Sequence, residues 1–244
     1  MTLRLAVRGE GPSDYGRWDH SQDRQEQEGC YLAFVRAALA QDPGELPLEL
    51  NCVSAGRFPR KLPGGKAKRK LPRLKGFERH AFYATLEASQ QGAQCLVIGA
   101  DTDRGLEGKK TRLPQACLER YEQFRVGHEK ATKFHGATEG VRLVALVPLV
   151  KLESWLLADE NAFRSAAGFE RGVLPRMPEE LYGQTDAKEH LTRLFRKHSR
   201  GEPEVADKAR LALAASPKVL SNECPISYPP FLDGVRKLGT ASQA

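Results

Sequence analysis

The stretch CLVIGADTD, residues 95–103, places two aspartates directly behind an apolar run of strand length. An apolar run without alternation is typical of a strand that is buried on both faces, as in a parallel sheet. Because side chains alternate along a strand, Asp101 and Asp103 would point to the same side if the extended geometry continues. The pattern therefore predicts an internal strand that carries two carboxylates at its carboxyl end.

Three further apolar segments have the length and composition of strands, namely residues 3–7, 46–53 and 142–150. Helical periodicity occupies the segments between the strands, over about residues 25–41, 77–92 and 112–125. Strands that alternate with helices favour a mostly parallel sheet that is flanked by helices. We therefore predict an α/β core over residues 1–165.

The remaining residues, 166–244, are predicted to form a mainly helical extension. Asp159 and Asp186 stand where N-caps of short helices are expected. Another helix is expected over about residues 203–215. The ending, near residues 221–235, is rich in Ser and Pro, and we expect it to be irregular, with its aromatic side chains folded back onto the core.

The net charge of +7 is carried by one segment of the chain. Residues 54–76 contain nine Lys and Arg residues and no acid, so the rest has 29 basic residues (38 − 9) against 31 acidic ones. Glycines and prolines predict an exposed basic loop, and such a loop binds a polyanion because neutralised phosphates release counterions. A solvated loop without a ligand is the alternative. The expected nucleic-acid contacts are Arg57, Arg60, Lys61, Lys66, Lys68, Arg69, Lys70, Arg73 and Lys75.

The composition also argues against several classes of protein. Hydrophobic residues make up 40% and charged residues 28%, which is typical of globular chains, and no apolar run approaches the roughly 20 residues of a membrane span. The five cysteines are odd in number, widely spaced and without a CxxC pair, which argues against a disulfide framework or a zinc knuckle. The chain has neither a Walker-type glycine loop nor a Gly-x-Ser-x-Gly elbow. We expect a cytoplasmic protein that does not enter a membrane.

Acidic residues follow three of the four predicted strands. Glu10 follows the first strand, Asp101 and Asp103 follow the third, and Glu153 lies just inside the helix after the last. The carboxyl ends of parallel strands share one edge of the sheet, where ligands bind, and clustered carboxylates repel each other without a cation. Oxygen ligands suit Mg²⁺ or Mn²⁺, so these four acids are the predicted metal ligands. Lys151 could stabilise developing negative charge beside them, although a solvated strand-end lysine explains it equally well.

A strand that ends in Glu-Gly, followed by a later strand that ends in Asp-x-Asp, resembles the Toprim domain of topoisomerases, bacterial primases and the overcoming-lysogenization-defect nucleases. PLVKLESWLLAD, residues 148–159, resembles a family of Toprim-like bacterial proteins with an E-x-W-[FL]-L-A-D signature. DAKEHL, residues 186–191, looks like the Asp-Pro-Lys-Glu segment of that family, with Ala187 in place of the proline. The polar insertion at residues 12–27 departs from the pattern, since related chains enter the helix sooner after the Glu-Gly turn.

The resemblance implies a Toprim-like fold in which Glu10 is a general acid/base or a metal ligand and Asp101 and Asp103 bind Mg²⁺. Glu153 matches the acid that precedes the tryptophan of the signature. Members of the Toprim-like family are often encoded beside ABC-type ATPases in phage-defence loci, so the resemblance also implies an ATPase partner.

The expected activity is Mg²⁺-dependent cleavage of a nucleic-acid backbone, DNA rather than RNA, by the effector of an ATPase-linked antiphage defence system. Two alternatives stay open. The chain could be a non-catalytic Toprim-fold subunit that docks an ATPase, or a phosphotransfer enzyme that acts on small nucleotides or tRNA, since fold does not dictate function. Trp155 is expected to pack in the core rather than to stack on a base.

Overall fold

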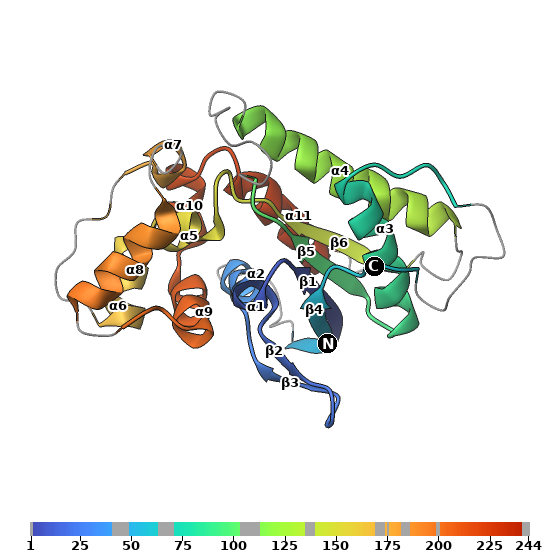
Figure 1. The fold of residues 1–244 in the computed structure, drawn as a ribbon, viewed down its shortest axis with the longest axis horizontal. Helices are drawn as coiled ribbons and strands as arrows, with labels where there is room; N and C mark the ends of the chain where they lie inside the picture. Colours follow the sequence, from blue (N-terminus) through green and yellow to red (C-terminus); the bar gives the residue numbers. More distant parts are fainter. Residues whose placement is uncertain are drawn as a thin grey trace.

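The computed structural model describes residues 2–40, 49–62, 71–102, 113–134, 140–168, 174, 176–181, 186–198 and 201–240. Within these ranges, a four-stranded sheet with the order β4-β1-β5-β6 forms the centre of the molecule (Figure 1). Its strands are β1 (Thr2–Gly9), β4 (Glu49–Arg57), β5 (Cys95–Gly99) and β6 (Arg142–Leu146), and all neighbours are parallel. The prediction of a mostly parallel sheet flanked by helices is confirmed.

The strand order reverses between β1 and β5. After β1 the chain crosses to β4 on one side, and it then returns to β5 on the other side of β1. Such a reversal opens a crevice at the carboxyl ends of the two central strands, which is where open α/β sheets bind ligands. Gly9 ends β1 and Gly99 ends β5, so these two glycines border the crevice.

Alternating side chains of the central strands fill two separate cores. Leu5, Val7 and Val97 belong to the core on the face covered by α2 (Cys30–Ala40) and α11 (Tyr228–Thr240). Ala6 and Ile98 belong to the core on the opposite face, which α3 (Phe77–Gln90) and α4 (Leu113–Phe134) cover (Figure 1). The sheet is buried on both faces, which is why its strands are apolar throughout.

The carboxy-terminal helices join the first of these cores. They are α5 (Leu152–Leu156), α6 (Glu160–Ala167), α7 (Pro178–Leu181), α8 (Ala187–Lys197), α9 (Val205–Ala214), α10 (Pro217–Glu223) and α11. Side chains of α9 and α11 share one hydrophobic cluster with β1 and α2. Asp159 and Asp186 accept hydrogen bonds from backbone N–H groups at the starts of α6 and α8, so both predicted N-caps are confirmed. The division at residue 165 stays a prediction.

The helix that was expected over about residues 25–41 starts later in the structure, after the polar insertion. A short helix α1 (Pro12–Tyr15) is followed by a hairpin of β2 (Arg17–Asp19) and β3 (Arg24–Gln27), and the predicted helix begins only at Cys30. Gly16 has a φ of 88° and would place a Cβ 2.0 Å from the Gln27 carbonyl oxygen, so only glycine fits there. This long-range approach redirects residues whose local pattern favoured a helix.

Two other expectations are corrected. The basic segment does not begin as a loop, because Ser54 to Arg57 form the last four residues of β4. The ending is not irregular, because it forms α10 and α11. Pro229 and Pro230 stand in the first turn of α11, where the missing N–H costs nothing, while Pro225 lies in the turn between the two helices. Phe231, Val235 and Leu238 recur on one buried face of α11. The expected return of its aromatic side chains to the core is confirmed by buried Tyr228 and Phe231.

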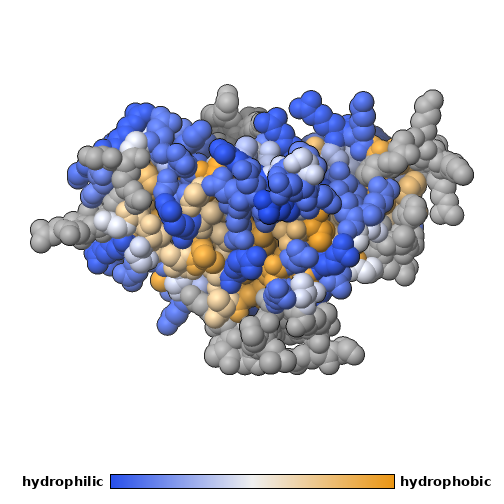
Figure 2. Space-filling view, turned by 90° about the horizontal axis from the view of Figure 1, so that it is seen from below, coloured by the Kyte–Doolittle hydropathy of each residue, from blue (hydrophilic) through white to orange (hydrophobic). Residues whose placement is uncertain are grey.

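None of the helices within the described ranges is long and apolar enough to cross a membrane. Figure 2 shows one face of the molecule, on which hydrophilic residues surround an apolar area near the middle.

Candidate functional site

The turn after β1 is closed by a carboxylate. Asp14 Oδ2 accepts hydrogen bonds from the backbone N–H groups of Glu10 (2.8 Å) and Gly11 (3.0 Å). A Cβ on Gly9 would lie 2.6 Å from Asp14 Cβ, so glycine is required for α1 to fold back this closely. The turn therefore holds Glu10 and Asp14 together at the carboxyl end of β1.

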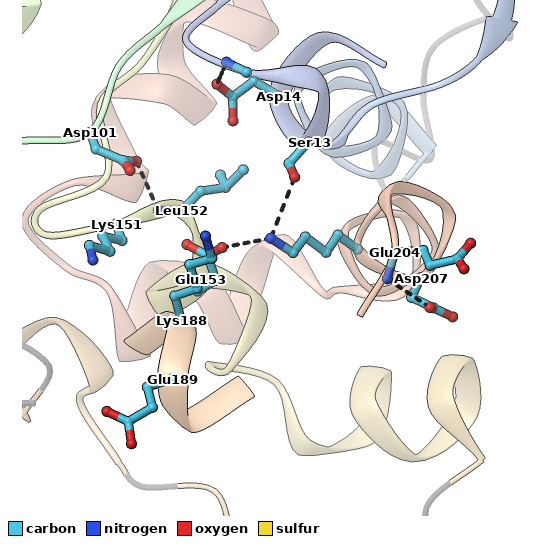
Figure 3. Close-up of polar contacts among 12 residues, drawn as sticks. Ser13, Asp14, Asp101, Lys151, Leu152, Glu153, Lys188, Glu189, Glu204 and Asp207 are labelled. Atoms are coloured by element: carbon cyan, nitrogen blue, oxygen red, sulfur yellow. Dashed lines mark hydrogen bonds and ion pairs between the residues drawn. The ribbon is translucent and has the colours of Figure 1, made fainter. Parts of the chain in front are cut away.

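Asp101 lies at the same edge, two residues beyond the end of β5. Since Arg8 pairs with Ile98 in the parallel register of β1 and β5, Glu10 lies nearly level with Asp101. Asp101 Oδ1 accepts a hydrogen bond of 3.0 Å from the backbone N–H of Leu152, the first residue of α5 (Figure 3). The carboxylate is thus fixed between the strand and α5.

The segment after Asp101 is tied to the chain before α5. Thr102 is fully buried, and its Oγ1 donates a 2.6 Å hydrogen bond to the carbonyl oxygen of Pro148. The Arg120 guanidinium donates to the carbonyl oxygen of Asp101 and lies 4.1 Å above the ring centroid of Phe77. Asp103, the second predicted aspartate, lies outside the described residues.

Tyr31 of α2 lies beneath the two strand ends. A Cβ on Gly99 would come within 2.8 Å of the Tyr31 ring, and a Cβ on Gly9 within 3.1 Å. Burial raises the pKa of Tyr31 well above its ordinary value, and the nearby carboxylates of Asp14, Asp101 and Glu10 raise it further. Tyr31 is only 1% exposed. The neutral hydroxyl is therefore a donor at the crevice.

Glu153 lies in the first turn of α5 and is buried. Its Oε1 is 2.7 Å from Nζ of Lys208, a buried residue of α9, and the same ammonium lies 3.4 Å from Ser13 Oγ (Figure 3). Burial alone would lower the pKa of Lys208, but the Glu153 carboxylate outweighs burial and the pKa lies above its ordinary value. Glu153 is thus paired with a cation within the protein.

Lys151 stands at the N-cap of α5, and its Nζ is 3.2 Å from Asp186 Oδ2. Burial would raise the pKa of Asp186, yet the Lys151 ammonium and the backbone N–H groups of α8 leave it below its ordinary value. In Figure 3, Lys188 extends from the start of α8 toward α5. Two lysines thus accompany the acids, and Lys151 has a structural partner in Asp186.

Asp14 carries the clearest sign of excess negative charge. Burial raises the pKa of Asp14 to about 6, the backbone N–H donors lower it, and the carboxylates of Glu10 and Glu153 raise it again. The carboxylates of Glu10 and Glu153 therefore act electrostatically on Asp14.

Replacing Asp14 by asparagine is expected to stabilise the metal-free protein at pH 8 and to have much less effect at pH 4. As the pH rises from 3.8 to about 6, the unfolded chain ionises Asp14 before the folded one does, so stability falls through this window. Above it, the buried charge costs on the order of 1–3 kcal/mol, which corresponds to several degrees of melting temperature. The melting temperatures of the wild type and of the Asp14→Asn variant, recorded in EDTA at both pH values, measure this difference in stability. Equal gains at pH 4 and pH 8 would contradict the raised pKa.

The predicted acids fit a divalent ion in their donor chemistry. They offer hard oxygen ligands, and the carboxylates of Glu10 and Glu153 contribute to the raised pKa of Asp14. Within the described ranges, however, no group of three or more His, Cys, Asp or Glu side chains stands close enough to hold a metal ion. Glu10, Asp14 and Asp101 gather at one edge, while Glu153 turns to Lys208.

The predicted nucleic-acid contacts divide into two groups. Arg57, Arg60, Lys61, Arg73 and Lys75 are exposed, whereas Lys66, Lys68, Arg69 and Lys70 lie outside the described residues. Arg57 pairs in register with Gly9, which places it at the carboxyl edge beside Glu10. Arg73 lies against α4, where its carbonyl oxygen accepts a hydrogen bond from Lys130. The described part of the segment thus extends from the acidic edge, the sheet edge that carries Glu10, Asp14 and Asp101, to the face that α3 and α4 cover.

A groove of about 870 Å³ follows the outer strand β4. Residues 51–57 form one wall, and Tyr15, Arg17 and Trp18 of the insertion lie across from them. Arg57 is the one predicted contact on its lining, and none of the predicted acids is there. The groove therefore adjoins the acidic edge without containing it.

Sequence reasoning missed Tyr31 and Lys208. One signal for Lys208 was present, because Lys208, Leu211 and Ala212 have the i, i+3, i+4 spacing of a buried helix face. Comparison of the chain with protein-family models, with curated proteins and with solved structures finds no match in any of the three.

Proposed function

We propose that this protein is a metal-dependent phosphodiester hydrolase of the Toprim type that cleaves nucleic acid. The observation that supports this most is the gathering of Glu10, Asp14 and Asp101 at the reversal point between β1 and β5, where ligand sites of open α/β sheets lie. The order of the Glu-Gly and Asp-x-Asp motifs along the chain supports the same assignment.

In this proposal Glu10, Asp101 and Asp103 hold Mg²⁺ or Mn²⁺, and Glu153 completes the acidic edge. The ion would supply charge stabilisation for the phosphoryl oxygens and an activated water. Asp101 is held in place by the Leu152 N–H, and the Tyr31 hydroxyl donates a hydrogen bond toward an anionic oxygen. Lys151 adds positive charge at the start of α5, and Arg57 binds the polymer backbone beside Glu10.

Cleavage of plasmid DNA, single-stranded RNA and mononucleotides, each with Mg²⁺, Mn²⁺ or EDTA, tests the proposal. We expect polymer cleavage that needs the divalent ion, with DNA preferred to RNA. An ABC-type ATPase, the partner that the sequence resemblance suggests, should be added in a parallel series. Loss of every activity in all series, together with an absence of divalent-ion binding, would overturn the proposal.

Replacing Lys68, Arg69 and Lys70 together by alanine is expected to weaken DNA binding equally for all sequences. Each lost phosphate contact removes about 0.9 from the slope of log affinity against log salt concentration, so the slope should flatten by up to about 3. Fluorescence anisotropy in EDTA at several salt concentrations measures this without cleavage. The matched control replaces the exposed Arg193, Arg196 and Lys197 of α8. An unchanged slope in the first variant would mean that the basic segment is only solvated surface.

A non-catalytic subunit that docks an ATPase is the second candidate. Two observations favour it. Glu153 is already paired with Lys208, and the described residues include no group of three or more His, Cys, Asp or Glu side chains that could hold a metal ion. Equilibrium binding of Mn²⁺ separates the two candidates, because the hydrolase requires it and the docking subunit does not.

A further inference from the structure

The groove beside β4 lies between two elements that do not pair with each other. Residues 51–57 of the outer strand form one wall, and Tyr15, Arg17 and Trp18 of the insertion line the other. The hairpin of β2 and β3 lies against β4 but forms a sheet of its own (Figure 1). The groove holds about 870 Å³, which is within the usual size of a ligand site. The side chains that line it indicate which class of ligand it suits.

Trp18 supplies an aromatic surface to this groove. One part of the side chain packs against the main hydrophobic core, while the half-buried residue also lines the groove. Packing on the core holds the indole in one place at the wall. A fixed aromatic ring that borders a groove is a platform on which a nucleic-acid base can stack, and such stacking is a main source of affinity for single strands.

Two exposed arginines line the opposite walls, Arg17 in β2 and Arg57 at the end of β4. Within the described residues, neither guanidinium has a hydrogen-bond or ion-pair partner. By contrast, Arg8 is buried and bonds to Glu87 and Ser54, so its charge belongs to the fold. Arg17 and Arg57 are therefore the cations that can bind phosphate groups from either wall.

Acids also line the groove, so it is not a uniformly basic channel. Four arginines and three acids are on the lining, and the pairing of Arg8 with Glu87 leaves three arginines (4 − 1) against two acids (3 − 1), Asp23 and Glu26. A surplus of one charge is too small to hold a polyanion by electrostatics alone. Binding must therefore combine stacking with a few phosphate contacts, which predicts a weak dependence on salt.

The groove leads to the acidic edge. Arg57 pairs in register with Gly9, which directly precedes Glu10, and Pro12 of α1 is also on the lining. In a duplex the bases stack on one another. Only an unpaired strand can turn a base onto an aromatic side chain, so the lining favours a single strand over a duplex.

We infer that this groove binds a single-stranded segment of nucleic acid, with a base stacked on Trp18 and backbone phosphates on Arg17 and Arg57. The inference rests on the proposed function for the choice of polymer, and it narrows the substrate to an unpaired strand that lies along β4 toward the acidic edge. An extended peptide added to the outer edge of β4 is the competing occupant. Such a peptide would bind backbone groups of β4 and would need neither the indole nor the guanidinium groups.

Tryptophan fluorescence tests the stacking directly. The chain has two tryptophans, and Trp155 is fully buried, so quenching by an added strand reports on Trp18. The full chain in EDTA is titrated with an oligothymidylate of about 12 nucleotides, a length within the site size of single-strand-binding domains. We expect saturable quenching in the wild type and none in Trp18→Phe. A duplex of the same length and thymidine monophosphate should quench far less.

Affinity for the same oligonucleotide, measured by anisotropy of a fluorescent label, gives the size of the effect. Trp18→Leu should bind about 5- to 150-fold more weakly, whereas Trp18→Phe keeps a ring on which the base can stack and should lose much less. The melting temperature of each variant shows whether it is folded, and the phenylalanine variant tests the inference if the leucine variant is not.

The arginines are tested by the salt dependence of the same binding. Replacing Arg17 and Arg57 together by glutamine should flatten the slope of log affinity against log salt concentration by about 1.4, since each phosphate contact of a single strand contributes about 0.7. The matched control replaces Arg24 and Arg79 by glutamine. Both are exposed and neither is on the lining of the groove, so the slope should stay unchanged.

An absence of quenching, equal quenching by the duplex, or equal affinity of the wild type and Trp18→Leu would overturn the inference, even if the chain cleaves nucleic acid. Conversely, single-strand binding that depends on Trp18 in a chain that cleaves nothing would support the inference while the proposed function fails.

Discussion

Replacing Asp101 by asparagine is expected to reduce metal-dependent cleavage by about 100-fold or more while the chain stays folded. The asparagine Oδ1 can still accept the hydrogen bond from the Leu152 N–H, so the start of α5 keeps its cap. The lost negative charge weakens the hold on the divalent ion, whose charge stabilisation amounts to several kcal/mol, and each 1.36 kcal/mol corresponds to tenfold in rate. Initial rates at saturating Mg²⁺, together with the melting temperature of the same preparation, measure both effects.

Asp159→Asn serves as the control for this prediction. Asp159 also accepts backbone hydrogen bonds at the start of a helix, from Asn161 and Ala162, as well as one from Ser216, but it is the N-cap of α6 and does not lie at the strand ends. The control should lower stability and leave cleavage unchanged. If Asp101→Asn behaved like the control, Asp101 would be a helix cap without a role in metal binding.

Truncation of Trp155 to alanine is expected to cause the largest loss of stability, about 3–5 kcal/mol, or roughly 6–20 °C of melting temperature. The side chain is fully buried, as the sequence pattern predicted. Its Nε1–H donates a 2.6 Å hydrogen bond to Ser227 Oγ, and its ring centroid lies 5.4 Å from that of Phe34 and 5.0 Å from that of Tyr228. The truncation would therefore remove contacts that join α5 to both α2 and α11.

Urea unfolding of Trp155→Ala and Trp18→Ala compares a buried tryptophan with a half-buried one. The Trp18 variant should lose much less stability, because part of its ring already faces water at the groove beside β4. Similar losses in the two variants would mean that Trp155 is not the centre of the shared core.

The four sheet strands and two N-caps could be predicted because their signals are local. A wholly apolar run such as CLVIG is suited to burial on both faces wherever it lies in the chain. Asp159 and Asp186 bond backbone N–H groups only two and three residues away, so their role follows from neighbours in sequence. The edge that carries Glu10 and Asp101 follows from the same logic, since both acids directly follow strands.

The hairpin and the two terminal helices were not predicted, because long-range contacts decide them. Gly16 lies against the carbonyl of Gln27, and Phe231 packs on Trp155, 76 positions earlier in the chain (231 − 155). Such contacts can override the local preference of a polar segment or of one rich in proline.

By itself, the sequence determined that this chain forms a parallel α/β sheet with acids at the carboxyl ends of its strands, because the spacing of apolar and acidic residues encodes both. Only the tertiary structure decided the partners of those acids. Asp101 caps a helix that begins 51 residues later, and Glu153 pairs with a lysine 55 residues away. The sequence shows that a residue carries a carboxylate, but it does not show which groups that carboxylate contacts. Its partner depends on which helices pack together, and the burial of apolar surface across the whole chain determines that packing.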